Sequence, residues 1–181
     1  MLIDAQRSAL LLIDVQEKLL PGIHDREAFV ENCRWLLDVA KLVDIPLLAS
    51  EQYPQGVGPT TETLLERLPA DKVFGKTHFS AVQAPEVGPQ IEALDREQIV
   101  ICGMEAHVCV LQTALDLRAR GKQVFVVADA ISSRSALDVE LAIARMREEG
   151  IRIVSREMVA FEWIGRSDAK PFKAFSTGFL K

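Results

Sequence analysis

Short apolar runs alternate along this chain with longer segments whose apolar residues recur every three or four positions. A strand that is covered on both faces has no polar face, so each short run predicts a buried strand. The predicted strands are residues 9–14, 46–50, 72–76, 98–102, 122–129 and 151–155. Strands that alternate with helices predict an α/β domain with a mainly parallel sheet and helices on both faces.

The clearest helical spacing lies in residues 26–43, where Phe29, Cys33, Leu36 and Ala40 share one face. Asp25 is the predicted N-cap of this helix. Shorter helices are predicted at residues 61–68 and 88–95, after Cys109 up to Gly121, from a capping-box pattern at Ser135 up to Gly150, and twice in the tail after residue 155. The Gly- and Pro-rich residues 51–59 predict a loop.

Length and composition restrict the class of protein. The 181 residues show no internal repeat and no linker, which predicts one domain over residues 1–181. Apolar residues make up 49% and charged residues 26%, as in ordinary soluble proteins. The net charge of -5 and the lack of a Lys/Arg run argue against a nucleic-acid partner.

Targeting signals and cysteine usage predict the compartment. The N-terminus lacks the basic start and long apolar segment of a signal peptide, and no stretch approaches the roughly 20 apolar residues that span a bilayer. Three cysteines, Cys33, Cys102 and Cys109, do not suggest a disulfide framework. We therefore expect a cytoplasmic protein that is not bound to a membrane.

Three reactive residues follow predicted strands. Asp14 ends the first strand, Lys76 ends the third, and Cys109 lies between the fourth strand and the next helix. Ligands of open parallel sheets bind at the carboxyl ends of the strands, so we expect these side chains to meet there. A helix start and a nearby ammonium would lower the pKa of the thiol, and a carboxylate could take its proton. The three residues would suffice for nucleophilic catalysis without histidine.

Other polar and aromatic residues fall at the same predicted edge, and five of them are candidate substrate-binding residues: Gln16, Glu51, Tyr53, Phe79 and His107. Tyr53 and Phe79 could stack on a planar substrate or could belong to the core. His78 and Asp129 follow the third and fifth strands. Each of these residues has a structural alternative, and a single cysteine near a helix start is more often a core residue.

Several cofactor and metal motifs are absent. Gly75-Lys76-Thr77 looks like the end of a phosphate-binding loop, but Ala70 stands where that motif needs glycine. The sequence contains no GxGxxG, no GxSxG and no His/Cys cluster with the spacing of metal ligands. We expect a small-molecule substrate and neither a cofactor nor a metal.

With Asp14, Lys76 and Cys109 identified, the chain resembles the isochorismatase-like cysteine hydrolase superfamily, which includes nicotinamidases and N-carbamoylsarcosine amidohydrolases. The matching stretches are LLLIDVQ, FGKTHFSA, CGMEAHVCVLQTALDL, VVADAISSRS and LAIARM, which together cover most of the chain. EQYPQGVGPT and the cysteine motif resemble in particular the subgroup of isochorismatase domain-containing proteins.

The resemblance implies a six-stranded parallel sheet of order 3-2-1-4-5-6 and a homo-oligomer. It also implies that Cys109 forms a covalent intermediate, that Asp14 is the general base and then acid, and that Lys76 supports their charges. The Met104–Glu105 bond would be a cis peptide. The backbone N–H groups of Glu105 and Cys109 would then form an oxyanion hole.

The sequence departs from well-known members of the superfamily. Nicotinamidases carry metal-binding histidines after strand two, whereas residues 50–58 contain none, which argues against a metal and against nicotinamide. True isochorismatases lack the cysteine, so Cys109 argues against isochorismate. Ala106 stands where many members have threonine.

The residues leave two other functions open. An exposed thiol of low pKa could sense peroxide, with Cys102 as its resolving partner. The fold could also serve as a non-catalytic scaffold. The expectation favoured by the acid, base and thiol together is a hydrolase that cleaves a small amide-like C–N bond.

Overall fold

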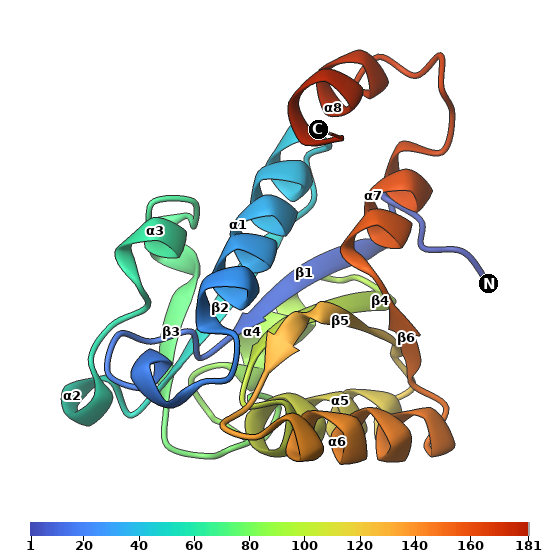
Figure 1. Cartoon of the computed structure of the whole chain (residues 1–181). Coiled ribbons are helices and arrows are strands. Elements are labelled where there is room, and N and C mark those ends of the chain that lie inside the picture. The colour runs from blue at the N-terminus through green and yellow to red at the C-terminus, as the bar shows by residue number, and fades with distance from the viewer. Residues whose placement is uncertain (181) are drawn as a thin grey trace.

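A six-stranded sheet organises the chain in the computed structural model, which describes residues 1–180 (Figure 1). The strand order is β3-β2-β1-β4-β5-β6, and every neighbouring pair is parallel. The strands are β1 Ser8–Ile13, β2 Leu47–Gln52, β3 Val73–Lys76, β4 Gln98–Met104, β5 Gln123–Ser132 and β6 Arg152–Val154. The predicted α/β architecture and strand order are confirmed.

Helices cover both faces of this sheet (Figure 1). One face packs against α1 (Arg26–Leu42) and α7 (Arg156–Ile164), and α8 (Phe172–Phe179) packs against the end of α1 away from the sheet (Figure 1). The other face packs against α4 (Gly88–Ala93), α5 (Leu111–Ala119) and α6 (Ala136–Glu148). Short helical segments occupy the connections: η1 Leu20–Gly22, α2 Pro54–Val57, α3 Glu62–Leu65, η2 Ala70–Lys72 and the π turn η3 Ala106–Val110.

Two apolar cores explain why the central strands are apolar throughout. In β1, Leu10 and Leu12 belong to the core under α1, whereas Ala9, Leu11 and Ile13 belong to the core under α5. Successive side chains of a strand point to opposite faces, so a strand between two helical layers needs apolar residues at every position. Within residues 1–180, no helix is both long and apolar enough to cross a membrane.

Helix ends follow the sequence signals in part. Gly121 and Gly150 have φ of 83° and 78° just beyond α5 and α6, as predicted for residues that end helices. Asp25 and Ser135 occupy the N-cap positions of α1 and α6, as predicted, but neither side chain makes a capping hydrogen bond. Ser155 caps α7 instead, because its Oγ accepts the Met158 N–H at 3.2 Å.

Two segments differ from the predicted boundaries. β5 continues to Ser132, three residues past its predicted end, so that Asp129 lies within the strand. Residues 54–57 form the single turn α2 inside the predicted loop. Ladder bonding to β4 keeps the backbone of β5 extended where the polar residues suggested that it would stop.

Gly103 lets β4 approach the end of β1 closely. Its φ is 124°, and a Cβ atom there would lie 2.2 Å from the backbone oxygen of Ile13. Only glycine fits such a contact without moving the backbone. The approach sets Asp14, the next residue after Ile13, beside the turn that carries Cys109.

Candidate active site

The three residues predicted to react lie together at the carboxyl edge of the sheet. Asp14 directly follows β1 with φ of 51°, Lys76 is the last residue of β3, and Cys109 lies in the π turn η3 before α5. The Lys76 Nζ donates a hydrogen bond to Asp14 Oδ2 at 2.8 Å. Asp14 and Lys76 are both close enough to the Cys109 sulfur to affect its pKa.

The Asp14–Lys76 ion pair is almost completely buried, with 2% and 0% of the two side chains exposed. Burying charges is costly unless hydrogen bonds satisfy them. Asp14 Oδ1 accepts a bond from Ser50 Oγ at 2.7 Å. Lys76 Nζ is also within 3.1 Å of the backbone oxygens of His78 and Phe79. These partners hold a carboxylate and an ammonium in fixed positions beside the thiol.

Gln52 is a residue of this site that the sequence did not indicate. Its Oε1 accepts a bond from Lys76 Nζ at 2.6 Å and lies 3.9 Å from Cys109 Sγ. The alternation of side chains along β2 could have indicated Gln52. Residues two positions apart in a strand point to the same face, so Gln52 lies on the same face as Ser50, which contacts Asp14. The strand was predicted to stop at residue 50, which concealed this alternation.

Burial and, to a smaller extent, the Asp14 carboxylate raise the pKa of the Cys109 thiol to about 12, although Lys76 opposes both effects. The expected lowering of this pKa is therefore wrong. The side chain is only 6% exposed, and the loss of water around a thiolate outweighs the single ammonium. In the resting site a neutral thiol lies beside an ion pair.

The pH dependence of alkylation will check this raised pKa. Because the acid form persists to higher pH when the pKa is raised, the reaction of Cys109 with iodoacetamide should accelerate roughly tenfold per pH unit between about pH 7 and 10, without a plateau. Mass spectrometry of the Cys109 peptide measures the rate. Glutathione in the same buffers is the control and should level off near pH 9. A plateau for Cys109 below pH 9 would contradict the raised pKa.

Two candidate substrate-binding residues, Gln16 and Glu51, are occupied by hydrogen bonds within the protein. Gln16 Nε2 donates to the backbone oxygens of Gln52 at 3.0 Å and Gly58 at 2.6 Å. Glu51 Oε1 accepts bonds from the N–H of Thr60 at 2.6 Å and its Oγ1 at 2.8 Å. Both residues fasten the loop after β2, so they shape the rim of the site.

Tyr53 and Phe79 are exposed, at 55% and 54%, and therefore do not belong to the core. Phe79 and His78 line a cavity of about 470 Å³ between the loop after β3 and α5.

The Nδ1 of His107 is hydrogen-bonded to Ser133 Oγ at 2.9 Å, and its Nε2 lies 4.0 Å from Asp138 Oδ2. These contacts hold His107 against the start of α6 and the loop that precedes it.

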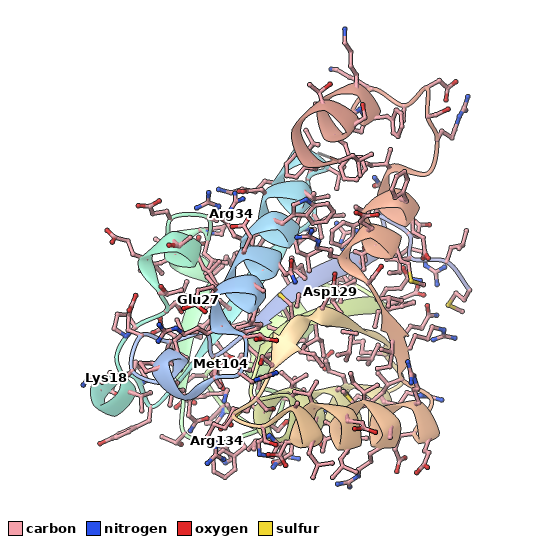
Figure 2. The ribbon with its side chains drawn as sticks, viewed as in Figure 1. Lys18, Glu27, Arg34, Met104, Asp129 and Arg134 are labelled. Atoms are coloured by element: carbon pink, nitrogen blue, oxygen red, sulfur yellow. The ribbon has the colours of Figure 1, made fainter. Side chains whose placement is uncertain are left out.

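Asp129 does not join the site. Its Oδ1 accepts a bond from the N–H of Arg156 at 2.9 Å, and its backbone oxygen accepts one from Asn32 Nδ2 at 2.6 Å. In Figure 2 it lies toward α7, apart from Met104 and Arg134. The reason is that β5 runs past this residue before it reaches the edge where Asp14 and Lys76 lie.

The turn before Cys109 contains a cis peptide bond between Met104 and Glu105. The Glu105 carboxylate accepts a bond from Arg134 Nε at 2.8 Å, and its backbone oxygen accepts bonds from the N–H groups of Val108 and Val110. The turn that carries Cys109 is therefore anchored through both the side chain and the carbonyl of Glu105.

Cys102 and Cys109 lie in different cores, Cys102 under α1 and Cys109 under α5. The sheet separates them, so Cys102 cannot act as a resolving partner for Cys109. Cys33 and Cys102 are both fully buried, as expected for core cysteines. Among residues 1–180, no three His, Cys, Asp or Glu side chains are grouped to hold a metal ion.

Known proteins are similar to this chain in sequence and in fold. A family model of the isochorismatase domain matches residues 8–158. Isochorismatase domain-containing protein 2A of Mus musculus is 38% identical over 169 residues, which are 93% of this chain and 80% of that protein.

Several solved structures are also similar to this chain in fold. The MAR1 ribonuclease structure from Caenorhabditis elegans has a TM-score of 0.92 and 36% identity and covers 100% of this chain and 93% of its own. YcaC structures from Pseudomonas aeruginosa, with hexane-2,5-diol and covalent acrylamide, and from Escherichia coli, described as an octameric hydrolase of unknown specificity, each have a TM-score of 0.92 and 26% identity, and cover 99% of this chain and 92% of theirs.

Proposed function

Because this chain belongs to the isochorismatase domain family of hydrolases, we propose that it is a cysteine hydrolase that cleaves a small amide-like C–N bond. The observation that carries the proposal is the buried Asp14–Lys76 ion pair beside the Cys109 thiol, whose pKa both charges affect. A nucleophile, a base and an orienting charge within one small volume are what covalent acyl transfer needs.

In the first half of the reaction, the Asp14 carboxylate takes the thiol proton as the Cys109 sulfur attacks the substrate carbonyl carbon. The new C–S bond converts the carbonyl to a tetrahedral oxyanion, which the N–H groups of Glu105 and Cys109 would stabilise. The C–N bond then breaks, and the carboxyl of Asp14 returns the proton to the leaving amine. The raised pKa of the thiol fits this sequence, because the proton stays on sulfur until a substrate arrives.

In the second half, a water molecule attacks the thioester carbon while Asp14 again takes a proton. The C–S bond breaks, the sulfur recovers its proton from Asp14, and a carboxylic acid leaves. The sum is an amide and water converted to an acid and an amine. Lys76 keeps its proton throughout and offsets the changing charge on Asp14 and the sulfur.

Two further features of the chain belong to the proposal. We propose that it assembles with copies of itself, as the similar octameric hydrolase of Escherichia coli does. Leu137 and Leu141, which are 59% and 58% exposed on α6, support this, because they form an apolar stripe one helical turn apart. The reaction steps given above use only side chains and backbone N–H groups of the protein and no metal or cofactor.

The proposal is tested by trapping the intermediate. The protein is mixed with a panel of small primary amides, carbamoyl compounds and activated esters, quenched in acid and examined by mass spectrometry. We expect an acyl mass on the Cys109 peptide, released as acid when the quench is delayed. Cys33 and Cys102 in the same digest are internal controls. Turnover of an amide without any acyl mass on Cys109 in rapid-quench samples would contradict the covalent route.

The other candidate functions have less support. The similar Caenorhabditis elegans structure is a MAR1 ribonuclease, but a net charge of -5 does not favour binding to a polyanion. A peroxide-sensing thiol should be exposed and of low pKa, whereas the Cys109 thiol is buried and its pKa is raised to about 12. RNA and hydrogen peroxide can be added to the same panel.

A further inference from the structure

The carboxamide of Gln52 has a defined orientation between β2 and β3. Its Nε2 donates to the backbone oxygen of Thr77 at 2.9 Å, and its Oε1 accepts from Lys76 Nζ at 2.6 Å. An ammonium can only donate and a carbonyl can only accept, so only one orientation of the amide satisfies both contacts. The oxygen therefore faces Lys76 and the Cys109 sulfur, which lies 3.9 Å away.

The carboxamide of Gln16 also holds the backbone of Gln52 through two hydrogen bonds. The Gln52 N–H donates to Gln16 Oε1 at 2.7 Å, and its carbonyl accepts from Gln16 Nε2 at 3.0 Å. Gln52 stands opposite Lys76 in the register of β2 and β3. The side chain is thus attached to a fixed strand end, and if it turned away it would lose its hydrogen bonds to Lys76 and Thr77.

From these contacts we infer that Gln52 is a positioning residue, whose carboxamide oxygen holds the Lys76 ammonium in place and accepts the resting Cys109 thiol. The inference rests on the proposed function for its catalytic meaning. One neutral side chain thus contacts both the Lys76 ammonium and the Cys109 thiol.

Two physical effects follow from this position. Lys76 Nζ has three hydrogens but four acceptors within 3.1 Å, and the contact with Gln52 is the shortest of the four. Without it, the ammonium would shift toward the remaining acceptors. The negative end of the amide dipole also faces the sulfur and favours the neutral thiol, in a site where the charged neighbours of the sulfur are Asp14 and Lys76.

These effects predict opposite changes in two measurements on Gln52→Met. Alkylation of Cys109 by iodoacetamide at pH 9 should become about three- to tenfold faster, because the opposing dipole is gone. The value of kcat/KM for an amide should fall about 10- to 100-fold, because Lys76 and the sulfur lose their common partner. In Gln52→Glu, alkylation should instead slow about tenfold, since a carboxylate then faces the sulfur.

Matched controls separate this role from a loss of folding. Gln6→Met makes the same chemical change at an exposed glutamine of the N-terminal segment, far from the carboxyl edge of the sheet, and should alter neither rate. Thermal unfolding is recorded for every variant. Gln52→Glu is nearly isosteric, so its alkylation rate tests the inference even if Gln52→Met does not fold.

The outcomes distinguish the inference from the proposed function. Equal alkylation rates in the wild-type and both Gln52 variants, or rates that both fall, would overturn the role of Gln52. An unchanged kcat/KM in folded Gln52→Met would overturn it as well. If the alkylation order Met, Gln, Glu holds but no amide or ester is hydrolysed by the wild-type protein, the inferred contact stands and the proposed function fails.

Discussion

Replacing Cys109 by alanine is expected to lower kcat/KM for the amide substrate by about 10⁴-fold or more and to remove the acyl mass. No other nucleophile shares its position, because Cys33 and Cys102 belong to the core on the other face of the sheet. Cys109→Ser should also be nearly inactive, since a hydroxyl gives up its proton far less readily than a thiol. Steady-state kinetics of the purified variants measures the loss.

Cys102→Ala serves as the matched control for this experiment. It removes a buried thiol from β4, the strand that leads into the turn of Cys109. We expect kcat/KM to stay within about twofold where the fold persists, because Cys102 belongs to the core on the other face of the sheet. Substantial residual activity in Cys109→Ala would mean that another group performs the attack. A comparable loss of kcat/KM in a well-folded Cys102→Ala would show that removing either cysteine lowers activity through altered packing and not through loss of the nucleophile.

Replacing Lys76 by methionine is expected to lower the free energy of unfolding by about 3–5 kcal/mol at neutral pH. The change leaves the Asp14 carboxylate buried, with Ser50 Oγ as its remaining side-chain hydrogen-bond donor. Urea titrations followed by the fluorescence of the two tryptophans will measure the loss. Hydrolysis should be lost with it, because the charge that supports Asp14 and the sulfur has gone.

A double variant separates the two consequences. Asp14→Asn with Lys76→Met removes both charges, and most of the lost stability should return, because no unpaired ion remains in the interior. Activity should not return. Lys72→Met is the control for lysine removal, and its side chain is 41% exposed, so we expect a change within about 0.5 kcal/mol. Equal stability of Lys76→Met and the double variant would contradict a buried, mutually dependent pair.

Much of the fold could be predicted from local patterns. The apolar runs around Leu10 and Val100 gave buried strands, and the three- to four-residue spacing from Phe29 to Ala40 gave α1 to within one residue of its observed end. These patterns predict structure well because the spacing of apolar residues reflects which faces of a strand or helix are buried. The N-cap positions of Asp25 and Ser135 were predictable, but their lack of capping hydrogen bonds was not, because it depends on how each side chain is oriented in the fold.

The grouping of Asp14, Lys76 and Cys109 also followed from the order of the elements, since parallel strands end at one edge. Gln52 did not, because its contact with Lys76 depends on where β2 ends and on its register with β3. The same limit applied to Asp129, which would have reached the site only if β5 had ended sooner.

Sequence alone thus indicated the strands and the main helices in their order along the chain, and which reactive residues stand at the strand ends, because these follow from local periodicity. The order of the strands within the sheet came from the family resemblance. Tertiary structure decided that the Cys109 thiol is neutral, that Cys102 is out of its reach and that Gln52 joins Lys76 to the sulfur. Burial, distance and the balance of opposing charges depend on residues far apart in the chain, and they take definite values only when the sheet has formed.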